Sequence, residues 1–427
     1  MLLAALLVLF PAGPAQAQPG SEPLTLEEAV TQAVKSNPAA LAAEQDIIIA
    51  RQRMSEARYT YLPQFTLSGT ASRVNLDYPS VLGPELGERY LDPLISRSSY
   101  TLRASALQPL YTGGKNANTL KLARTAHNQA RVNYETVKAD VALEAKKAFY
   151  DLLYRTRLKE TASAWLAGAQ DYAALLKTSD PAEALEARVL LAGLSGRARE
   201  AVSGLDAAAT ALQKALNREP GYQVAAAGDF EPLPVRDEVT RCLVTAMEAR
   251  PDLKSELYKA QMDDIAVNMA MIRRYPTVYL GASYDINAYK LSALNESSLR
   301  SNNWLASLAI HFPLSYDIWT QVRQRKAQQR QGELKRVELQ DKIRFEIIAA
   351  HKDAVFWRQE AERRKAEVEQ LKAGYKAAAA AGRSLAGLRA AGATAELERG
   401  WLEAVYNQLM ARIRLEWAQG RDLPKQD

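Results

Sequence analysis

The property that most constrains this chain is an internal repeat with a very long period. Pro251 follows Pro38, and Pro276 follows Pro63, by the same 213 residues. In each half the first proline lies inside a helix-like run, and the second precedes a stretch of alternating apolar and polar residues. A repeat of this length predicts a pseudo-symmetric architecture. The predicted parts are a first structural repeat at 18–235, a second at 236–420 and a C-terminal tail at 421–427.

Residues 1–17 have the pattern of a secretory signal peptide. An apolar stretch from Leu2 to Phe10 precedes Ala15-Gln16-Ala17, an A-x-A cleavage signal. The stretch is too short to cross a bilayer as a helix. No Lys or Arg precedes it, which departs from the usual signal. The alternative is a buried N-terminal helix, and the cleavage signal favours export.

Long helices are predicted in both halves. Thr25 and Glu28 form a capping box before the first helix, and Pro38 should break or kink that helix. The stretches at about 117–177 and 320–388 contain no proline, and sixty helical residues span roughly 90 Å. Each long helix is expected to fold back once. The predicted turn residues are Ser179 and Pro181 in the first half, and Gly387 and Gly392 in the second.

Four strands are predicted, at about 64–76, 99–108, 277–287 and 303–312. Apolar and polar residues alternate in each, with aromatic residues near the ends, which is the weak signature of outer-membrane strands. Alternation also fits a soluble sheet, so this pattern leaves both possibilities open. The predicted strand-to-helix turns contain Pro109, Gly113 and Gly114 in the first half and Pro313 in the second.

Several segments in order along the chain resemble the TolC-like outer-membrane efflux protein family. The residues that carry the resemblance are Leu24-Thr25-Leu26-Glu27-Glu28-Ala29, Asn37-Pro38, Leu62-Pro63, Gln108-Pro109-Leu110-Tyr111-Thr112-Gly113-Gly114, Ala148-Phe149-Tyr150-Asp151-Leu152 and Arg414-Leu415-Glu416-Trp417-Ala418-Gln419-Gly420. No single segment decides the matter; their order, spacing and duplication together are fairly specific.

The resemblance implies a mainly α fold with a small β part. Coiled-coil hairpins would form a periplasmic α-barrel, and four strands per protomer would enter a shared twelve-stranded barrel of a homotrimer. The chain would be a passive exit duct in the outer membrane of a Gram-negative bacterium, serving a tripartite efflux or type I secretion system. Its implied partners are outer-membrane lipid, a periplasmic adaptor and an inner-membrane pump.

One part of this expectation follows from physics alone. Four strands cannot close a barrel, and an open sheet edge facing lipid leaves backbone groups unpaired at several kcal/mol each. A membrane location therefore requires more than one copy of the chain.

The helical tips depart from the family pattern, which often places Tyr-x-x-Gly and an acidic residue near each turn. Candidate gating residues are the acidic groups nearest the predicted turns, Asp180, Glu396 and Glu398, with Arg389 as a possible ion-pair partner. The alternative is an ordinary solvated helix face.

No enzyme, cofactor or metal site is predicted. His127, His311 and His351 are isolated from one another in the sequence. The only cysteine, Cys242, is predicted to be a small buried residue. No basic block with interleaved aromatic residues suggests nucleic-acid binding. The main alternative function is a soluble periplasmic coiled-coil scaffold. A metal-binding helical-bundle enzyme would need inward Glu-x-x-His pairs, and no convincing pair is found.

Overall fold

The computed structural model describes residues 23–73, 98–174, 176, 180–219, 224–235, 237–313, 316–381 and 384–421. The predicted signal peptide, Ser179 and residues 422–427 of the predicted tail lie outside the described residues.

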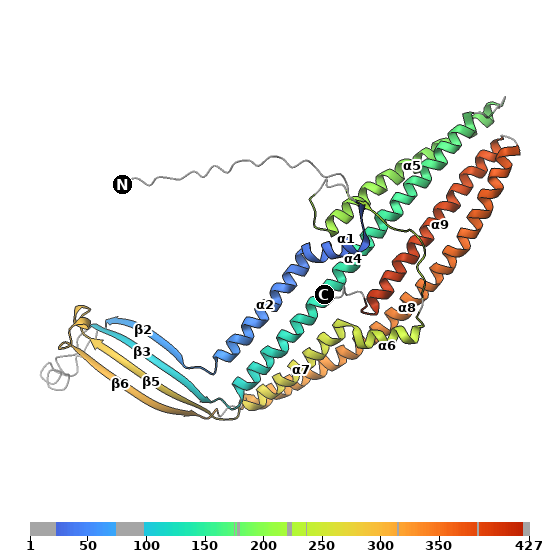
Figure 1. The fold of residues 1–427 in the computed structure, drawn as a ribbon. Helices are drawn as coiled ribbons and strands as arrows, with labels where there is room; N and C mark the ends of the chain where they lie inside the picture. The colour runs from blue at the N-terminus through green and yellow to red at the C-terminus, as the bar shows by residue number, and fades with distance from the viewer. Residues whose placement is uncertain are drawn as a thin grey trace, which may run out of the picture. The chain divides into compact units, whose positions relative to one another are not determined.

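The protein is mainly helical, with short helices that precede the strands and long helices that follow them (Figure 1). This confirms the predicted mainly α fold with a small β part. The short helices are α1 (Leu26–Ser36), α2 (Pro38–Tyr59), α6 (Val239–Ala249) and α7 (Pro251–Ile272). The long helices are α4 (Lys115–Ala174), α5 (Pro181–Ala215), α8 (Asp317–Ala381) and α9 (Leu385–Ala418).

Four antiparallel strands form one sheet in the order β2-β3-β5-β6 (Figure 1). The central pairing joins the two repeats, because β3 comes from the first and β5 from the second. A separate parallel pair joins β1 and β4, and a short 3₁₀ helix, η1, lies between β5 and β6. The bounds are β1 (Pro23–Leu24), β2 (Gln64–Arg73), β3 (Ser98–Tyr111), β4 (Ala225–Ala226), β5 (Thr277–Ala288), η1 (Ser292–Asn295) and β6 (Arg300–His311).

The repeat is reproduced residue by residue in the helices that precede each strand pair. A shift of 213 residues carries the bounds of α1 and α2 onto those of α6 and α7, and the start of β2 onto the start of β5. Both helix pairs break at a proline. Asn37 and Arg250 end the first helix of each pair in an extended or non-helical conformation, as expected for a residue before proline.

The first helix begins at the predicted capping box. The Thr25 side chain accepts a hydrogen bond from the Glu28 backbone, and the Glu28 carboxylate accepts one from the Thr25 N–H at 2.9 Å. These two bonds satisfy amide groups that the first helical turn leaves without partners.

The chain forms two compact units, and each takes segments from both repeats. The first unit comprises Met1–Ala42, Glu135–Arg250 and Asp341–Asp427, and the second comprises Ala43–Tyr134 and Pro251–Gln340. The sheet belongs to the second unit, and the turns between the long helices belong to the first. The repeat is therefore a symmetry of the sequence that does not coincide with these units.

The core of the first unit packs parts of α4, α5 and α9 around aromatic and aliphatic side chains. Phe149 is fully buried, as are Leu212 and Leu409. The Tyr154 and Tyr406 rings stack with centroids 4.8 Å apart. Fully burying a large apolar side chain contributes about 1.5–3 kcal/mol. The Ala148–Leu152 motif thus lies at the centre of this core.

Candidate functional site

The strand pairing separates the sheet into an apolar face and a largely polar face. Directly paired residues project to the same face of a sheet, so the register assigns each side chain to a side. The apolar face carries Phe65, Leu67, Gly69, Ala71, Tyr100, Leu102, Ala104, Ala106, Val278, Leu280, Ala282, Tyr284, Ile286, Trp304, Ala306, Leu308 and Ile310, and the same register places the polar residues Gln108 and Asn302 on it.

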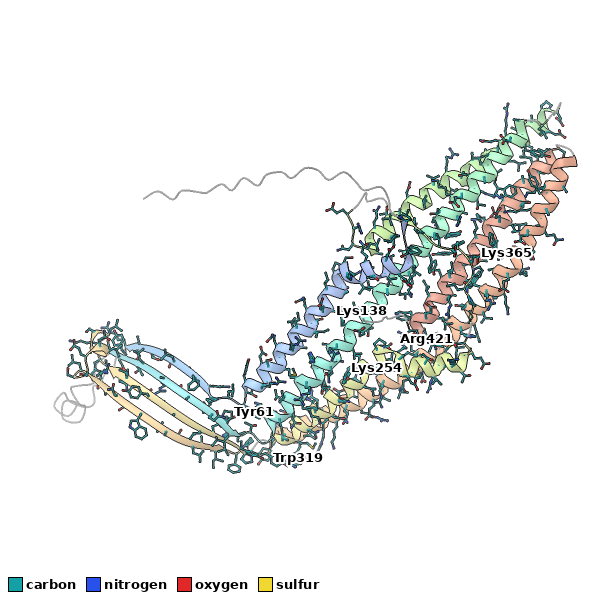
Figure 2. All side chains as sticks on the ribbon, viewed as in Figure 1. Tyr61, Lys138, Lys254, Trp319, Lys365 and Arg421 are labelled. Atoms are coloured by element: carbon teal, nitrogen blue, oxygen red, sulfur yellow. The ribbon has the colours of Figure 1, made fainter. Side chains whose placement is uncertain are left out.

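This apolar face is exposed in the single chain, and side chains along the strands stand clear of the ribbon (Figure 2). Phe65 and Trp304 are each 79% exposed, Leu67 is 81% exposed and Leu308 is 60% exposed. A soluble monomer rarely exposes a continuous apolar patch of this kind, so the face needs an apolar surrounding.

The opposite face carries polar side chains over its central rungs. One rung runs across all four strands as Ser68, Arg103, Asp285 and Asn303. In this rung the Arg103 guanidinium donates two hydrogen bonds to the Asp285 carboxylate, at 2.6 and 3.0 Å. The neighbouring rungs are Thr70-Thr101-Asn287-Ser301 and Thr66-Ser105-Ser283-Leu305.

Both edges of the sheet are open. In the described strands β2 pairs only with β3, and β6 pairs only with β5. Each edge therefore presents a row of backbone N–H and C=O groups that can pair with another strand. A sheet with one lipid-compatible face and two open edges can be completed by further copies of itself.

None of the helices in the described ranges is both long and apolar enough to cross a membrane.

The turn from β3 to α4 depends on two glycines. Gly113 and Gly114 have φ values of 62° and 89°, the left-handed region that favours glycine. A Cβ on Gly113 would lie 2.9 Å from the Cβ of Tyr275. The predicted role of these two residues in the strand-to-helix turn is consistent with this geometry, and Pro313 lies just beyond β6.

The assignment of Pro109 to that turn was wrong, because β3 continues through it to Tyr111. The β3–β5 register shifts between Pro109 and Tyr111, which marks a bulge. A proline has no N–H to donate and is tolerated in a strand at such a bulge. The strand therefore continues through the proline, and the turn consists of Thr112, Gly113 and Gly114.

The first long hairpin turns where the sequence predicted. Pro181 is at the start of α5, and the Asp180 carboxylate accepts a hydrogen bond from the Ala182 N–H at 2.9 Å. Asp180 is thus an N-cap, and its negative charge faces the N-terminal end of the helix dipole.

The second long hairpin turns earlier than predicted, and Gly387 and Gly392 lie inside α9 instead of in the turn. Ser384 is the N-cap of α9, and its side chain accepts a hydrogen bond from the Gly387 N–H. Glycine inside a helix costs only about 1 kcal/mol relative to alanine, which packing can offset. The N-cap of α9 is therefore Ser384, and both predicted turn glycines follow it inside the helix.

Gly387 has a specific packing reason to be glycine. A Cβ at this position would overlap the hydroxyl group of Tyr172 in α4. That hydroxyl accepts a hydrogen bond from the Ser384 N–H at 3.0 Å and is 3.3 Å from the Ser384 carbonyl oxygen. The last turn of α4 is thereby tied to the start of α9. By contrast, a Cβ on Gly392 would meet nothing within 4 Å.

The three predicted acidic residues do not come together as one cluster in the chain. Glu396 and Glu398 lie roughly three turns into α9, because the helix begins at Leu385. Glu398 is buried, and it accepts hydrogen bonds from the Trp165 indole at 2.7 Å and from Lys372 at 2.5 Å. It therefore joins α9 to both α4 and α8.

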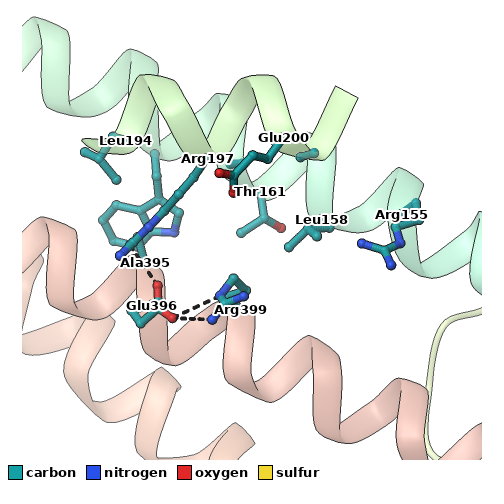
Figure 3. A pocket seen from close by; sticks show the side chains of 12 residues that line it. Arg155, Leu158, Thr161, Leu194, Arg197, Glu200, Ala395, Glu396 and Arg399 are labelled. Atoms are coloured by element: carbon teal, nitrogen blue, oxygen red, sulfur yellow. Dashed lines mark hydrogen bonds and ion pairs between the residues drawn. The ribbon is translucent and has the colours of Figure 1, made fainter. Parts of the chain in front are cut away.

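Glu396 lies beside a cavity of about 300 Å³ between α4, α5 and α9 (Figure 3). Its carboxylate pairs with Arg197 of α5 at 2.7 Å and with Arg399 of its own helix at 2.5 Å (Figure 3). The first of these ion pairs ties α5 to α9 across the cavity. Leu158, Trp165 and Leu194 give the cavity an apolar part of its lining.

Arg389 pairs with Glu186 of α5. The sequence analysis identified Arg389 as a candidate but not Glu186. The guanidinium donates two hydrogen bonds to the carboxylate, at 2.5 and 2.6 Å. These bonds hold the pKa of the Glu186 carboxyl below its ordinary value of 4.5. Nothing in the sequence links these positions, since the two lie on different helices and share no local motif.

The described residues contain no group of three or more His, Cys, Asp or Glu side chains that could hold a metal ion. The interactions found at the turns are caps, ion pairs and packing contacts. They can hold helices together or release them, and both open sheet edges can pair with further strands.

Comparison with known protein families gives one match. Residues 29–218 match the model of a family described as outer membrane efflux protein. No curated protein matches the sequence. The matched segment contains α2, the first strand pair and both helices of the first long hairpin, α4 and α5. The resemblance noted from sequence is confirmed by this match.

Several solved structures share the fold. The chain is similar to the CmeC outer membrane channel of Campylobacter jejuni, with a TM-score of 0.76 and 16% identity over 93% of this chain and 86% of that one. It is similar to VceC of Vibrio cholerae, with a TM-score of 0.75 and 15% identity over 92% and 96%. The open state of MtrE from Neisseria gonorrhoeae gives a TM-score of 0.77 and 16% identity over 93% and 89%. At these identities the likeness establishes the fold.

Proposed function

We infer that the chain is an outer membrane efflux protein that acts as a passive exit channel, embedded in the outer membrane and extending into the periplasm. The observation that carries this proposal is the sheet, with one exposed apolar face and one polar face. Strands that alternate in this way suit a barrel wall, with lipid outside and water inside. The match of residues 29–218 to the efflux family supports the same function.

We propose that three copies complete the barrel. Each copy supplies a four-stranded sheet whose edges β2 and β6 are open. Two copies would give eight strands, and a barrel of about eight strands has an interior filled by its own side chains. Three copies would give twelve strands and a wider lumen, an even number within the range of bacterial outer-membrane barrels. The homotrimer is thus the smallest assembly that both closes the edges and leaves a passage.

Outer membrane efflux channels work with periplasmic adaptors and inner-membrane pumps. We propose that this chain does the same, in a tripartite efflux or type I secretion system, and that the pump supplies the energy. The turns between α4 and α5 and between α8 and α9 are the proposed partner-facing end. Binding of a partner can shift a conformational equilibrium only if the partner binds the two states with different affinity.

The proposed gate consists of ties between the two long hairpins. Arg389–Glu186 and Glu396–Arg197 each join α9 to α5, and Glu398 joins α9 to α4. Movement of one hairpin past the other would break these contacts together. The gate is thus assigned to paired residues on facing helices, and Asp180 is assigned to helix capping.

The alternative of a soluble periplasmic scaffold conflicts with the exposed apolar face of the sheet. A scaffold with those strands would have to bury Phe65, Leu67 and Trp304 against the bundle, and these side chains are more than three-quarters exposed. Cell fractionation separates the two functions. The channel should sediment with outer membranes, and a chain found only in the soluble periplasm would contradict the proposal.

Conductance tests the channel directly. The purified protein, reconstituted in a planar lipid bilayer, should give discrete single-channel steps under an applied voltage. Substitution Asp180→Ala should leave these steps nearly unchanged, whereas Glu398→Ala should alter their open probability. A membrane-inserted protein that never conducts would overturn the exit-channel function.

A further inference from the structure

The polar face of the sheet holds a single pair of opposite charges away from the strand ends. Arg103 and Asp285 are that pair. Within the four strands as the structure describes them, Asp285 is the only acidic residue. The other basic groups, Arg73, Arg300 and His311, are the terminal residues of their strands. The interior of the sheet therefore carries one positive and one negative fixed charge per chain.

The two charges compensate each other through a direct contact. The guanidinium and carboxylate form a bidentate pair at 2.6 and 3.0 Å, an arrangement that is both strong and geometrically specific. The side chains are 54% and 17% exposed, so the pair is accessible from the polar side. One rung away, the Thr101 hydroxyl donates a hydrogen bond to the Asn287 side chain at 2.7 Å.

The rest of this rung is neutral. Ser68 and Asn303 flank the pair on β2 and β6, and the adjoining rungs carry uncharged side chains. An ion moving along this face would therefore meet a net fixed charge of about zero. Removal of one member would leave the other as an uncompensated charge, repeated in every copy around the barrel.

We propose that the Arg103–Asp285 pair determines the charge selectivity of the barrel lumen. Because the two charges cancel, the lumen wall has no net charge at this rung, and solutes of either sign can pass. This inference rests on the proposed channel function, which makes the polar face the lumen wall. A ring of uncompensated charged side chains is a common means of ion selection in channels. In this sheet the rung instead carries two opposite charges, Arg103 and Asp285, which compensate each other. Such a lumen wall suits an exit channel for cargo of either charge.

The test is the reversal potential across a planar bilayer with a KCl gradient. Asp285→Asn exposes the Arg103 charges, and its reversal potential should move toward anion preference. Arg103→Gln exposes the Asp285 charges and should move it toward cation preference. The double variant should return to the wild-type value. Arg73→Gln is the matched control, because it removes the same charge from the end of β2 and should leave the potential unchanged.

Salt concentration provides a second readout. The screening length is about 30 Å at 0.01 M salt and about 3 Å at 1 M. The shifts in both single variants should be large in dilute salt and disappear in concentrated salt. A change in sheet structure would not produce shifts of opposite sign that salt removes.

A further variant keeps the inference testable if the single variants do not assemble. Asn303→Asp adds a carboxylate to the same rung and leaves the Arg103–Asp285 pair in place. It should shift the reversal potential toward cations. Conducting variants with unshifted reversal potentials would overturn the selectivity inference and leave the channel function intact. A wild-type protein that does not conduct would instead overturn the channel function.

Discussion

In the sheet each functional side chain is one member of a long alternating series, whereas in the long helices each has one or two specific partners. Phe65, Leu67 and Trp304 share their face with many other apolar residues. Arg389 has Glu186, and Glu398 has Trp165 and Lys372. A conservative substitution at one position therefore leaves the two faces of the sheet distinct, and only a charge on the apolar face disturbs them strongly. A contact between two helices can be broken by removing either side chain.

The largest expected effect comes from a charge on the apolar face. Leu308→Arg would place a guanidinium against lipid, which costs roughly 2–4 kcal/mol near the bilayer midplane. Ser307→Arg is the matched control, because Ser307 lies on the opposite face of the same strand. We expect Leu308→Arg to lower the yield of protein in the outer membrane and Ser307→Arg to leave it nearly normal. Equal yields would show that the two faces do not have different surroundings.

A smaller loss is expected at the buried carboxylate of the helical unit. Glu398→Ala would leave the Trp165 indole N–H and the Lys372 ammonium without this acceptor, at a cost of about 1–3 kcal/mol. Glu396→Ala breaks more exposed ion pairs, which contribute about 0–1 kcal/mol. Thermal unfolding followed by circular dichroism in detergent should show the larger fall in midpoint for Glu398→Ala. The reverse order would refute the assigned roles.

Gly387 and Gly392 of α9 are expected to respond to alanine substitution with opposite signs. Gly387→Ala should destabilise the protein, because overpacking against Tyr172 costs about 1–3 kcal/mol and exceeds the gain in helix propensity. Gly392→Ala has open space around its Cβ and should stabilise the helix by about 1 kcal/mol. The same thermal midpoints measure both. If Gly387→Ala stabilises the protein, the Tyr172 side chain can move away from the added methyl group without loss of stability.

The smallest effect is expected from acid at the Arg389–Glu186 tie. The Arg389 guanidinium lowers the pKa of the Glu186 carboxyl below its ordinary value of 4.5, so the carboxylate is still mostly charged at pH 4.5. A group with a lowered folded pKa stabilises the tied state above its ordinary pKa and loses that contribution as pH falls through the lowered value. Open probability should therefore rise only below about pH 4.5.

Glu186→Gln should remove this acid-dependent step and give a raised open probability already at neutral pH. An identical pH dependence in the wild-type and Glu186→Gln channels would assign the response to other groups.

The sequence predicted the parts of the fold that depend on periodic patterns. The proline offset predicted the repeat, and alternation predicted four strands whose ends differ by a few residues from those observed. The Thr25 capping box and the break at Pro38 were also correct, because both depend on residues close together in sequence. Local rules are sufficient where the determining contacts are local.

The parts that were missed depend on contacts between distant residues. Pro109 was wrongly assigned to a turn. The bulge that accommodates it within β3 depends on pairing with β5, a strand that is distant in sequence. Gly387 was also wrongly assigned to a turn. The reason for a glycine at this position is its close packing against Tyr172, which lies in another helix. Ser384 was available as an N-cap signal after Gly382, and it marks the turn better than the later glycines do. The partner of Arg389 could be identified only from the packing of α5 against α9.

The central claim is that the open edges β2 and β6 of neighbouring copies pair to close a barrel of three chains. The direct measurement is thiol cross-linking in membranes, on a Cys242→Ser background, with Ser68→Cys on β2 and Ser307→Cys on β6. A short bifunctional reagent should link the chains into dimers and trimers, and the ladder should stop at three. Chains that stay monomeric, or a ladder that continues past three, would contradict the account.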